Sequence, residues 1–217
     1  SISRAGMVGL SRVLRKRTSI EPGEPLDVDI ETDELAFLPL LYWAVSPRQP
    51  PLSDAATEKL NQYLKRGGTI LFDTRERGNF ATNSFGQGGP ASQHLRMLLR
   101  GLDIPSLIPA PRDHVMTKAF YLLKRFPGRW AGGALWVERR GGNHNDGVSS
   151  VMIGANDWAG AWAVDELGAA MFAVVPGGER QREIAYRFGV NWVMYALTGN
   201  YKTDQVHLPA IIERLGQ

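Results

Sequence analysis

Apolar residues recur every three or four positions near the start of the chain, between Arg4 and Arg17. They would lie on one face of a helix, and they are Met7, Leu10, Val13 and Leu14. Arg and Lys residues are concentrated at the end of the segment, where the helix dipole favours positive charge. The pattern therefore predicts an amphipathic helix whose basic end needs no anionic ligand to explain it.

A strand, a helix and a second strand follow. Residues 36–45 are continuously apolar and aromatic, which is typical of a strand covered on both faces in a parallel sheet, and we expect this strand to be central. Ser53 or Asp54 is an N-cap for the helix, and a double glycine at 67–68 ends it. Residues 69–72 then form a short β-branched and aromatic strand, so the order predicts a right-handed βαβ unit.

The same rules predict the remaining elements. They are an exposed or edge strand at 26–30, a helix at 91–99, strands at 134–138 and 148–153 joined by a hairpin loop at 141–147, and a long helix at 179–197 that a glycine cap ends at 198–200. Residues 75–90 form the longest irregular stretch, and long loops of this kind are typical of lids and binding loops. Apolar residues at helical spacing in 208–215 are expected to pack on the core.

These elements predict an α/β fold with three layers, in which helices cover both faces of a doubly wound, mostly parallel sheet. A chain of 217 residues with 43% hydrophobic content suits a single domain spanning residues 1–217. Because the chain begins with Ser1 and no methionine, we expect it to be a piece of a longer protein.

Composition excludes several classes of function. The chain has no cysteine, which rules out thiolate nucleophiles, disulfides and cysteine-ligated metal centres. Its 25 basic and 22 acidic residues leave a net charge of +3 without a clustered basic stripe, so we expect no nucleic-acid partner. The longest nearly uncharged apolar run, 35–45, is about half of what a membrane-spanning helix requires. We expect no cofactor and no membrane span within this chain.

Ligands of open α/β sheets bind beyond the carboxyl ends of the strands. Candidate ligand-binding residues of this kind are Asp73, Arg75, Asp113, His114, Asn156, Asp157 and Trp158. If their segments converge, Asp73, His114 and Asp157 would form a carboxylate–imidazole cluster. Such a cluster could hold a divalent metal ion or carry out general acid–base catalysis.

Purely structural roles are the alternative interpretation of these candidate residues. Asp73 would brace the turn that follows it, Asp157 would cap a helix that begins at Trp158, and Asp113-His114 would bond to the nearby backbone. The glycines at 86–89 precede a helix and invite a phosphate site there, but neither a P-loop nor a dinucleotide-binding motif is present. Four tryptophans are interpreted as core packing more readily than as a sugar-stacking platform, and they are Trp130, Trp136, Trp158 and Trp162.

A set of short motifs is specific when taken together. They are Ile2–Gly6, Arg17-Thr18, the strand from Gly67-Gly68 to Asp73, Asp113-His114, Phe120–Leu123, Gly154–Trp158, and Phe188–Asn191 through Tyr195–Tyr201. In these motifs, essentially the whole chain resembles a bacterial family of uncharacterised domains, domain of unknown function 4159. The resemblance implies a class I glutamine amidotransferase-like, flavodoxin-type fold, with a further strand upstream of Ser1, and it supplies no activity.

The resemblance also implies a setting. Such domains are often carried at the C-terminal end of a longer protein whose N-terminal membrane segment resembles aerotolerance regulators. We therefore expect a domain tethered to the bacterial inner membrane by a segment absent from this chain, with other domains of that chain or envelope proteins as partners. Amidotransferases attack glutamine with a thiolate on a strand-to-helix elbow, whereas the corresponding turn here, Phe72–Arg75, has no cysteine. Thr74 as a substitute nucleophile would depend on Asp73 or Glu76 as its base.

The sequence thus favours a non-catalytic ligand-binding or interaction domain of a membrane-associated bacterial protein, with its surface around Asp73, Arg75, His114 and Asp157. The alternative is a metal-assisted hydrolase, in which Asp73, His114 and Asp157 hold a cation that activates water. A third interpretation is a structural partner in an envelope complex, docked through residues 208–215.

Overall fold

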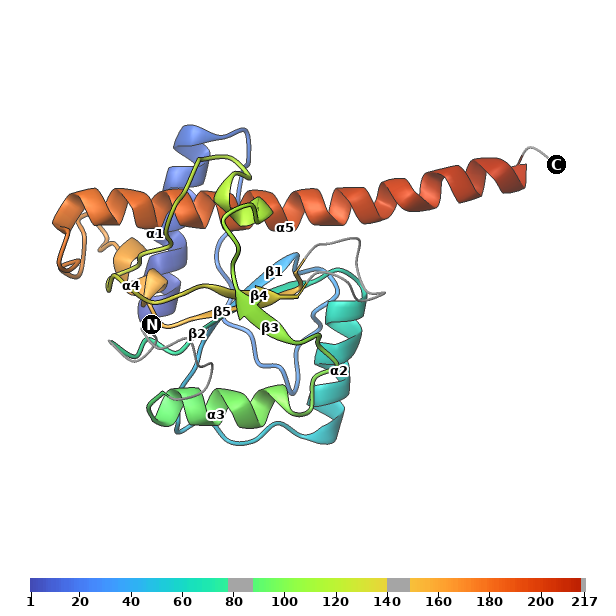
Figure 1. The fold of residues 1–217 in the computed structure, drawn as a ribbon, viewed down its shortest axis with the longest axis horizontal. Helices are drawn as coiled ribbons and strands as arrows, with labels where there is room; N and C mark the ends of the chain where they lie inside the picture. Colours follow the sequence, from blue (N-terminus) through green and yellow to red (C-terminus); the bar gives the residue numbers. More distant parts are fainter. Residues whose placement is uncertain (78–87, 140–148, 216–217) are drawn as a thin grey trace.

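The computed structural model describes residues 1–77, 88–139 and 149–215, with side chains described as far as residue 198 (Figure 1). In chain order its elements are α1 (Ile2–Arg17), β1 (Leu40–Ala44), α2 (Asp54–Lys65), β2 (Thr69–Asp73), α3 (Pro90–Leu99), β3 (Leu107–Pro109), the 3-10 turn η1 (Val115–Thr117), β4 (Trp136–Glu138), β5 (Val151–Gly154), α4 (Trp158–Trp162) and α5 (Gly178–Leu215).

The five strands form one sheet in the order β1-β2-β5-β4-β3. β1, β2 and β5 run parallel, whereas β4 is antiparallel to β5 and β3 is antiparallel to β4. The expectation of an α/β fold is confirmed, but the sheet is mixed, with its parallel part at β1, β2 and β5. The predicted flavodoxin-type arrangement goes beyond this finding and remains a prediction.

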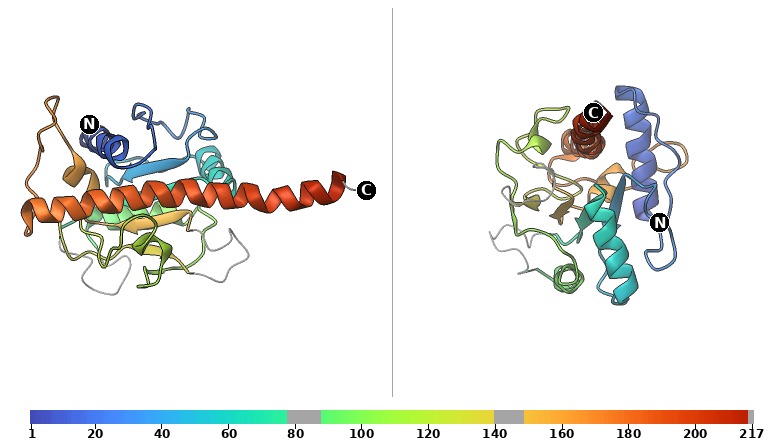
Figure 2. Two further views of the ribbon diagram at one scale, coloured as in Figure 1. Left: turned by 90° about the horizontal axis from the view of Figure 1, so that it is seen from above. Right: turned by 90° about the vertical axis from the view of Figure 1, so that its right-hand side faces the viewer.

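Helices cover both faces of the sheet, with α1, α4 and α5 on one side and α2 and α3 on the other (Figures 1 and 2). Alternate residues of β2 separate two cores, because Leu71 packs with α1, α4 and α5, while Ile70 and Phe72 pack with α2 and α3. Such alternation follows from the two-residue period of a strand. β2 is buried on both faces for this reason.

Local signals in the sequence identify several elements correctly. The amphipathic helix at the start is α1, with basic residues in its last turn. Ser53 is the N-cap of α2, since its hydroxyl accepts a hydrogen bond from the Ala56 N–H. The predicted strands at 134–138 and 148–153 pair antiparallel as β4 and β5. The predicted hairpin loop between them and most of the long loop at 75–90 lie outside the described residues.

The apolar run at 36–45 is not a central strand. Residues 36 and 37 form a turn, and the strand from Leu40 to Ala44 lies at the edge of the sheet. Its apolar character has another cause, because the two faces of this edge strand are still covered. Tyr42 packs edge-on against Trp162 and Trp192, and Trp43 packs on Phe72.

The predicted edge strand at 26–30 is also wrong. The carbonyl oxygens of Ile30, Glu31 and Asp33 accept hydrogen bonds from the Lys59 ammonium group, and the Asp33 carboxylate accepts from the Asp29 N–H. These bonds hold the turn that begins at residue 30, and residues 26–29 before it have no regular structure, so no strand forms here.

The predicted glycine cap at 198–200 is wrong, because α5 continues to Leu215 and runs past the sheet (Figure 2). The Thr198 hydroxyl donates to the Met194 carbonyl one turn back, so this residue belongs to the helix. The predicted packing of 208–215 concerns side chains outside the described residues. In the part of the chain that the structure describes, no helix is both long enough and apolar enough to cross a bilayer.

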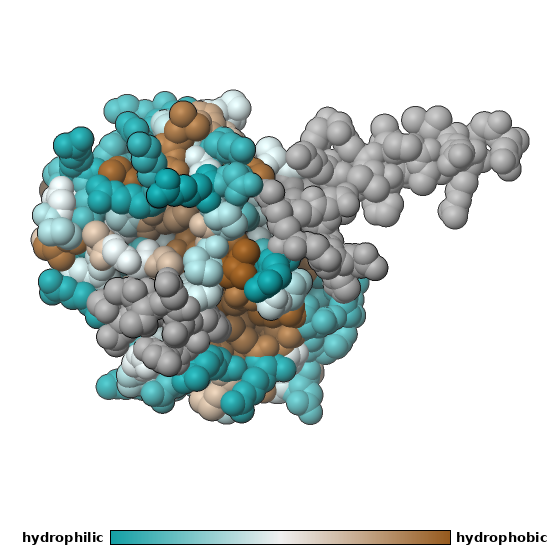
Figure 3. Space-filling model, viewed as in Figure 1, coloured by the Kyte–Doolittle hydropathy of each residue, from teal (hydrophilic) through white to brown (hydrophobic). Residues whose placement is uncertain are grey.

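Hydrophobic residues also reach the surface at the edge of the sheet opposite β1, where β3 is the last strand. Figure 3 shows them in the region of β3 and β4, where Leu107 and Ile108 of the edge strand β3 are half-buried. This edge of the sheet therefore leaves some apolar surface uncovered.

Close packing of α1 on α4 leads to a prediction about Gly9. Replacing an exposed helical glycine by alanine normally stabilises a helix by roughly 0.5–1 kcal/mol, but a Cβ at Gly9 would collide with the Trp162 carbonyl oxygen. We expect Gly9→Ala to lower the free energy of unfolding by about 1–3 kcal/mol, the usual cost of overpacking. Urea unfolding followed by circular dichroism would measure the change.

Gly23→Ala is the matched control, because nothing lies within 4 Å of a Cβ at that position. Equal unfolding midpoints for the two variants would contradict the close approach of α1 to α4.

Candidate functional site

The carboxyl ends of β2 and β5 lie side by side, as the sequence predicts. Asp73, the last residue of β2, is paired with Gly154, the last residue of β5. The chain turns directly after each of these residues. We call the surface formed by residues 73–77, 128–133 and 155–158 the carboxyl edge.

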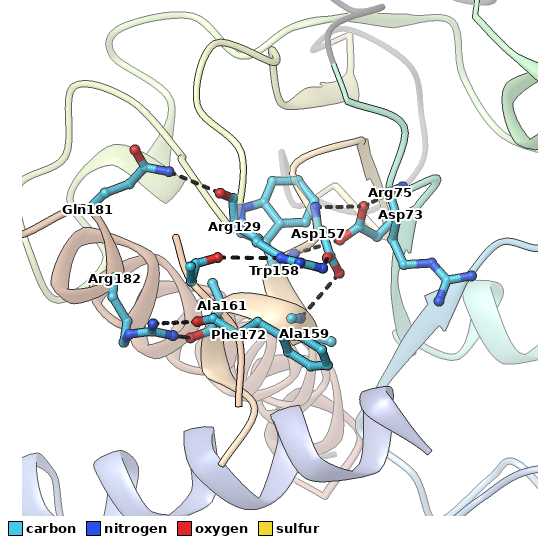
Figure 4. Close-up of polar contacts among 12 residues, drawn as sticks. Asp73, Arg75, Arg129, Asp157, Trp158, Ala159, Ala161, Phe172, Gln181 and Arg182 are labelled. Carbon is cyan, nitrogen blue, oxygen red and sulfur yellow. Dashed lines mark hydrogen bonds and ion pairs between the residues drawn. The ribbon is translucent and has the colours of Figure 1, made fainter. Parts of the chain in front are cut away.

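The Asp73 carboxylate is fully buried at the centre of the carboxyl edge. Its Oδ2 accepts hydrogen bonds from the Tyr42 hydroxyl at 2.7 Å and the Trp158 N–H at 2.8 Å. Its Oδ1 accepts from the N–H groups of Arg75 at 2.9 Å and Asp157 at 3.2 Å (Figure 4). Asp73 therefore braces the turns that follow β2 and β5, as the structural interpretation of the sequence predicts.

Burial controls the protonation of this carboxylate. Loss of water and, to a smaller extent, the nearby Asp157 charge raise the pKa of Asp73 from an ordinary value of 3.8 to about 6. The hydrogen bonds from Tyr42 and the backbone lower it, but they offset only part of the burial cost. Burial and the Asp73 charge in turn hold the pKa of Tyr42 well above its usual range.

Asp157 is the N-cap of α4, as the sequence predicts. Its Oδ1 accepts a hydrogen bond from the Gly160 N–H at 3.2 Å. Its backbone is left-handed, with φ 52°, a conformation that Asp tolerates better than most residues. Its Oδ2 lies 3.5 Å from Nη1 of Arg129, and its carbonyl accepts from the Arg129 N–H.

Asn156 and Trp158 connect β5 to the loop that carries residues 126–133. The Asn156 amide donates to the carbonyls of Phe126 at 2.8 Å and Gly133 at 3.1 Å. Trp158 donates through Nε1 to the same Phe126 carbonyl and packs on Phe188. Both side chains are buried, so they position this loop and do not face a ligand.

Arginine and aromatic side chains form the exposed part of the carboxyl edge. Arg75 has a left-handed backbone and donates through Nη2 to the Val45 carbonyl, while its Nε is buried without a partner. The guanidinium groups of Arg77 and Arg129 lie 5.2 and 4.6 Å from the centre of the Trp130 ring. Arg77, Arg129 and Trp130 were not among the predicted site residues. No helical or strand period marks them, and the adjacent Arg129-Trp130 pair is their only signal in the sequence.

Three of the four tryptophans are core residues, as predicted. Trp158 and Trp162 are fully buried, and Trp136 is nearly so. Trp130 differs, because it is half-buried at the carboxyl edge.

His114 lies at the opposite end of β5. Its Nδ1 accepts from the Met116 N–H, so it caps η1, and its ring lies 5.9 Å from that of Tyr195. The Tyr195 hydroxyl accepts from the N–H of Ser149, which precedes β5. Because a strand rises about 3.3 Å per residue, the start of β5 lies about 10 Å from its carboxyl end, and Ser149 lies before that start.

The structure therefore does not bring Asp73, His114 and Asp157 together. Asp113 is exposed beside His114 and does not join the carboxyl edge either. Across residues 1–77, 88–139 and 149–198, no group of three His, Cys, Asp or Glu side chains is placed to hold a metal ion. The predicted metal site loses its geometric basis.

A carboxylate of the chain itself is bound at the N-terminus of α3. Glu76 accepts hydrogen bonds from the N–H groups of Ala91 at 2.9 Å and Ser92 at 3.3 Å, and also from the Ser92 hydroxyl. A carboxylate of the chain itself thus occupies the position where a phosphate would bind. Residues 78–87 of the preceding loop lie outside the described residues.

A cavity of about 380 Å³ lies at the amino ends of β1 and β2, away from the carboxyl edge. It is lined by the segment from Glu34 to Pro39 without Phe37, by one face of α2, and by Gly67-Gly68. Lys59, one of its lining cations, already donates to three backbone carbonyls. Sequence reasoning gave no indication of this cavity, because its walls combine a helix face with a loop and a turn that no single motif connects.

The raised pKa of Asp73 predicts how stability depends on pH. A carboxyl group whose pKa is higher in the folded than in the unfolded protein stabilises the fold most below the unfolded value. Its contribution is lost as the pH rises from 3.8 through about 6. Relative to Asp73→Asn, the wild-type free energy of unfolding should therefore fall by about 2–3 kcal/mol between about pH 4 and pH 7.5.

Denaturant unfolding over this pH range would measure the difference, and carbon NMR titration of the Asp73 carboxyl would locate the pKa directly. Tyr42→Phe sharpens the test, because it removes a hydrogen bond that lowers the pKa and should move the transition to higher pH. A wild-type advantage that grows with pH would refute the assignment.

The two roles of Asp157 can be separated by substitution. Asp157→Asn keeps a capping oxygen and a residue that tolerates left-handed backbone, so its stability should stay within about 0.5 kcal/mol of wild type. Asp157→Ala loses both and should cost about 2 kcal/mol, with Asp157→Gly in between. Chemical denaturation would rank the three variants, and equal stability of the Asn and Ala variants would contradict the capping role.

A family model matches most of the chain. The family model described as "Domain of unknown function (DUF4159)" matches residues 1–197. The matched region includes all the residues of the carboxyl edge and ends within α5. No curated protein is similar enough in sequence to match the chain. The family model covers well over half of the chain, and the chain belongs to the family of domains of unknown function DUF4159.

Proposed function

We propose that this chain is a non-catalytic ligand-binding or interaction domain, and that the carboxyl edge is its binding surface. The observation that carries the proposal is the state of the Asp73 carboxylate, which is buried and accepts four internal hydrogen bonds. A general acid or base must reach the proton that it transfers. Asp73 instead holds the turns of the edge, and arginine and aromatic side chains form its accessible part.

The turn after β2 supports the same conclusion. Thr74, the residue that could replace a nucleophilic cysteine, is buried, and its hydroxyl lies 3.5 Å from the Gly154 carbonyl. An activated nucleophile needs a base within hydrogen-bonding distance and access to substrate. The neighbouring carboxylates have other roles, since Glu76 caps α3 and Asp73 binds four donors.

The setting of the domain is part of the proposal. We place it as a single α/β domain within a longer, membrane-associated bacterial protein, on the strength of the family resemblance. Its partners would be other domains of that protein or envelope proteins.

A thermal-shift screen with anionic, neutral and cationic small molecules tests the proposal. Compounds that stabilise the chain should perturb backbone amides of residues 74–77 and 129–133 in NMR spectra. Trp130→Ala should abolish their effect on the melting temperature. Phe37→Ala is the matched control, because Phe37 is an aromatic residue with 88% exposure beside the cavity at the amino ends of the strands.

Two results would contradict the proposal. The first is that the stabilising compounds perturb residues that line that cavity and leave the carboxyl edge unperturbed. The second is that the wild type chemically converts a compound that Asp73→Asn leaves unchanged.

A further inference from the structure

Arg129 has a guanidinium group that is fixed in place but has hydrogen-bonding capacity left. Its central carbon lies 4.6 Å from the ring centres of both Trp130 and Phe172. Its polar contacts are long, at 3.5 Å to Asp157 and 3.4 Å to the Ala173 carbonyl, beyond the usual range for N–H···O bonds. The side chain is 28% exposed. A planar guanidinium held by aromatic rings can bind carboxylate or phosphate through two parallel hydrogen bonds.

A second guanidinium, that of Arg77, lies over the same Trp130 ring. Arg77 is exposed and forms no ion pair with any acidic side chain of the described residues. Among the described residues, Asp157 is the carboxylate paired with Arg129, and it also caps α4. Two cations beside one ring repel each other, and an anion that contacts both would relieve this repulsion.

Side chains from α5 hold these groups in position. The Gln181 amide donates to the carbonyls of Gly128 and Val175, at 2.9 and 3.0 Å. Buried Arg182 donates to the Phe172 carbonyl at 2.6 Å and to the Ala161 carbonyl at 2.7 Å (Figure 4). The loops that carry Arg129 and Phe172 are thus fixed on one helix. A surface ordered in advance loses less entropy on binding.

We infer that the ligand of the carboxyl edge carries an oxyanion, a phosphate or carboxylate group, bound between Arg77 and Arg129 beside the Trp130 ring. This inference rests on the proposed function, because it names the chemistry of the ligand at the same surface. The anion shares the Arg129 guanidinium with Asp157, whose Oδ1 stays on the Gly160 N–H.

NMR titration of the 217-residue chain at constant ionic strength tests the inference. The probes are inorganic phosphate and citrate as oxyanions, glucose as a neutral molecule and choline as a cation. Both oxyanions or one of them should shift the Trp130 indole N–H resonance, assigned with Trp130→Phe, while glucose and choline should not. Comparison of phosphate with citrate decides between the two oxyanion classes.

Substitutions locate the site. Arg129→Gln and Arg77→Gln should each weaken binding of the active oxyanion at least about tenfold. Arg129→Lys keeps the charge but loses the planar geometry, and should weaken binding severalfold. Arg96→Gln is the matched control, because it removes one exposed arginine from the last turn of α3, at the far end of that helix from its bond to Glu76 of the carboxyl edge, and should leave binding unchanged.

The outcomes separate this inference from the proposed function. If glucose or choline shifts Trp130 as strongly as the oxyanions do, the carboxyl edge stays a binding surface and the oxyanion assignment is overturned. Oxyanion binding that is unchanged in both Arg77→Gln and Arg129→Gln also overturns the assignment. If no probe perturbs the carboxyl edge while other compounds perturb residues elsewhere, both proposals fail.

Discussion

The buried carboxylate of Asp73 is the interaction on which the arrangement of this fold's carboxyl edge depends. It joins Tyr42 of β1, the turn after β2 and the turn between β5 and α4. A buried charge is unfavourable unless hydrogen bonds compensate it, and the rise of its pKa to about 6 shows that four donors compensate it only in part. Without this acceptor, however, buried donors from three segments would lack a partner, which costs more than a typical hydrogen bond contributes.

Elements with local signals could be predicted from the sequence, whereas those that depend on distant partners could not. Ser53 caps α2 through a bond to a residue three positions away, and β2 is recognised by its own apolar residues. β1 lies at the edge because the sheet continues from β2 towards β5 and not beyond β1. This order depends on β5, which comes much later in the chain. Apolar and polar residues alternate at 26–30 as in a strand. However, the Lys59 ammonium group of α2 donates to the Ile30 carbonyl, and residue 30 lies in a turn.

The same division applies to the candidate site. Asp73 and Asp157 were correctly expected at one edge, because parallel neighbours bring their carboxyl ends together, and the capping role of Asp157 follows from its position before a helix. The position of His114 depends on its packing against Tyr195 of α5, which no motif around His114 indicates. Arg77 and Arg129 lie over the same Trp130 ring only because the turn after β2 and the loop at 128–133, far apart in the sequence, meet at the carboxyl edge.

Asp73 also links the buried and exposed parts of the carboxyl edge. Arg75 and Asp157 both have left-handed backbones and both donate their N–H groups to Oδ1 of Asp73. This conformation costs roughly 1–2 kcal/mol for a residue with a side chain, and the bonds to one charged oxygen offset that cost at both turns. The second turn then fixes the arginine surface, because the carbonyls of Asn156 and Asp157 accept from the N–H groups of Trp130 and Arg129. A carboxylate with no exposed atom can in this way set the geometry of the cations at the surface, because the turns that it braces carry the backbone acceptors of Arg129 and Trp130.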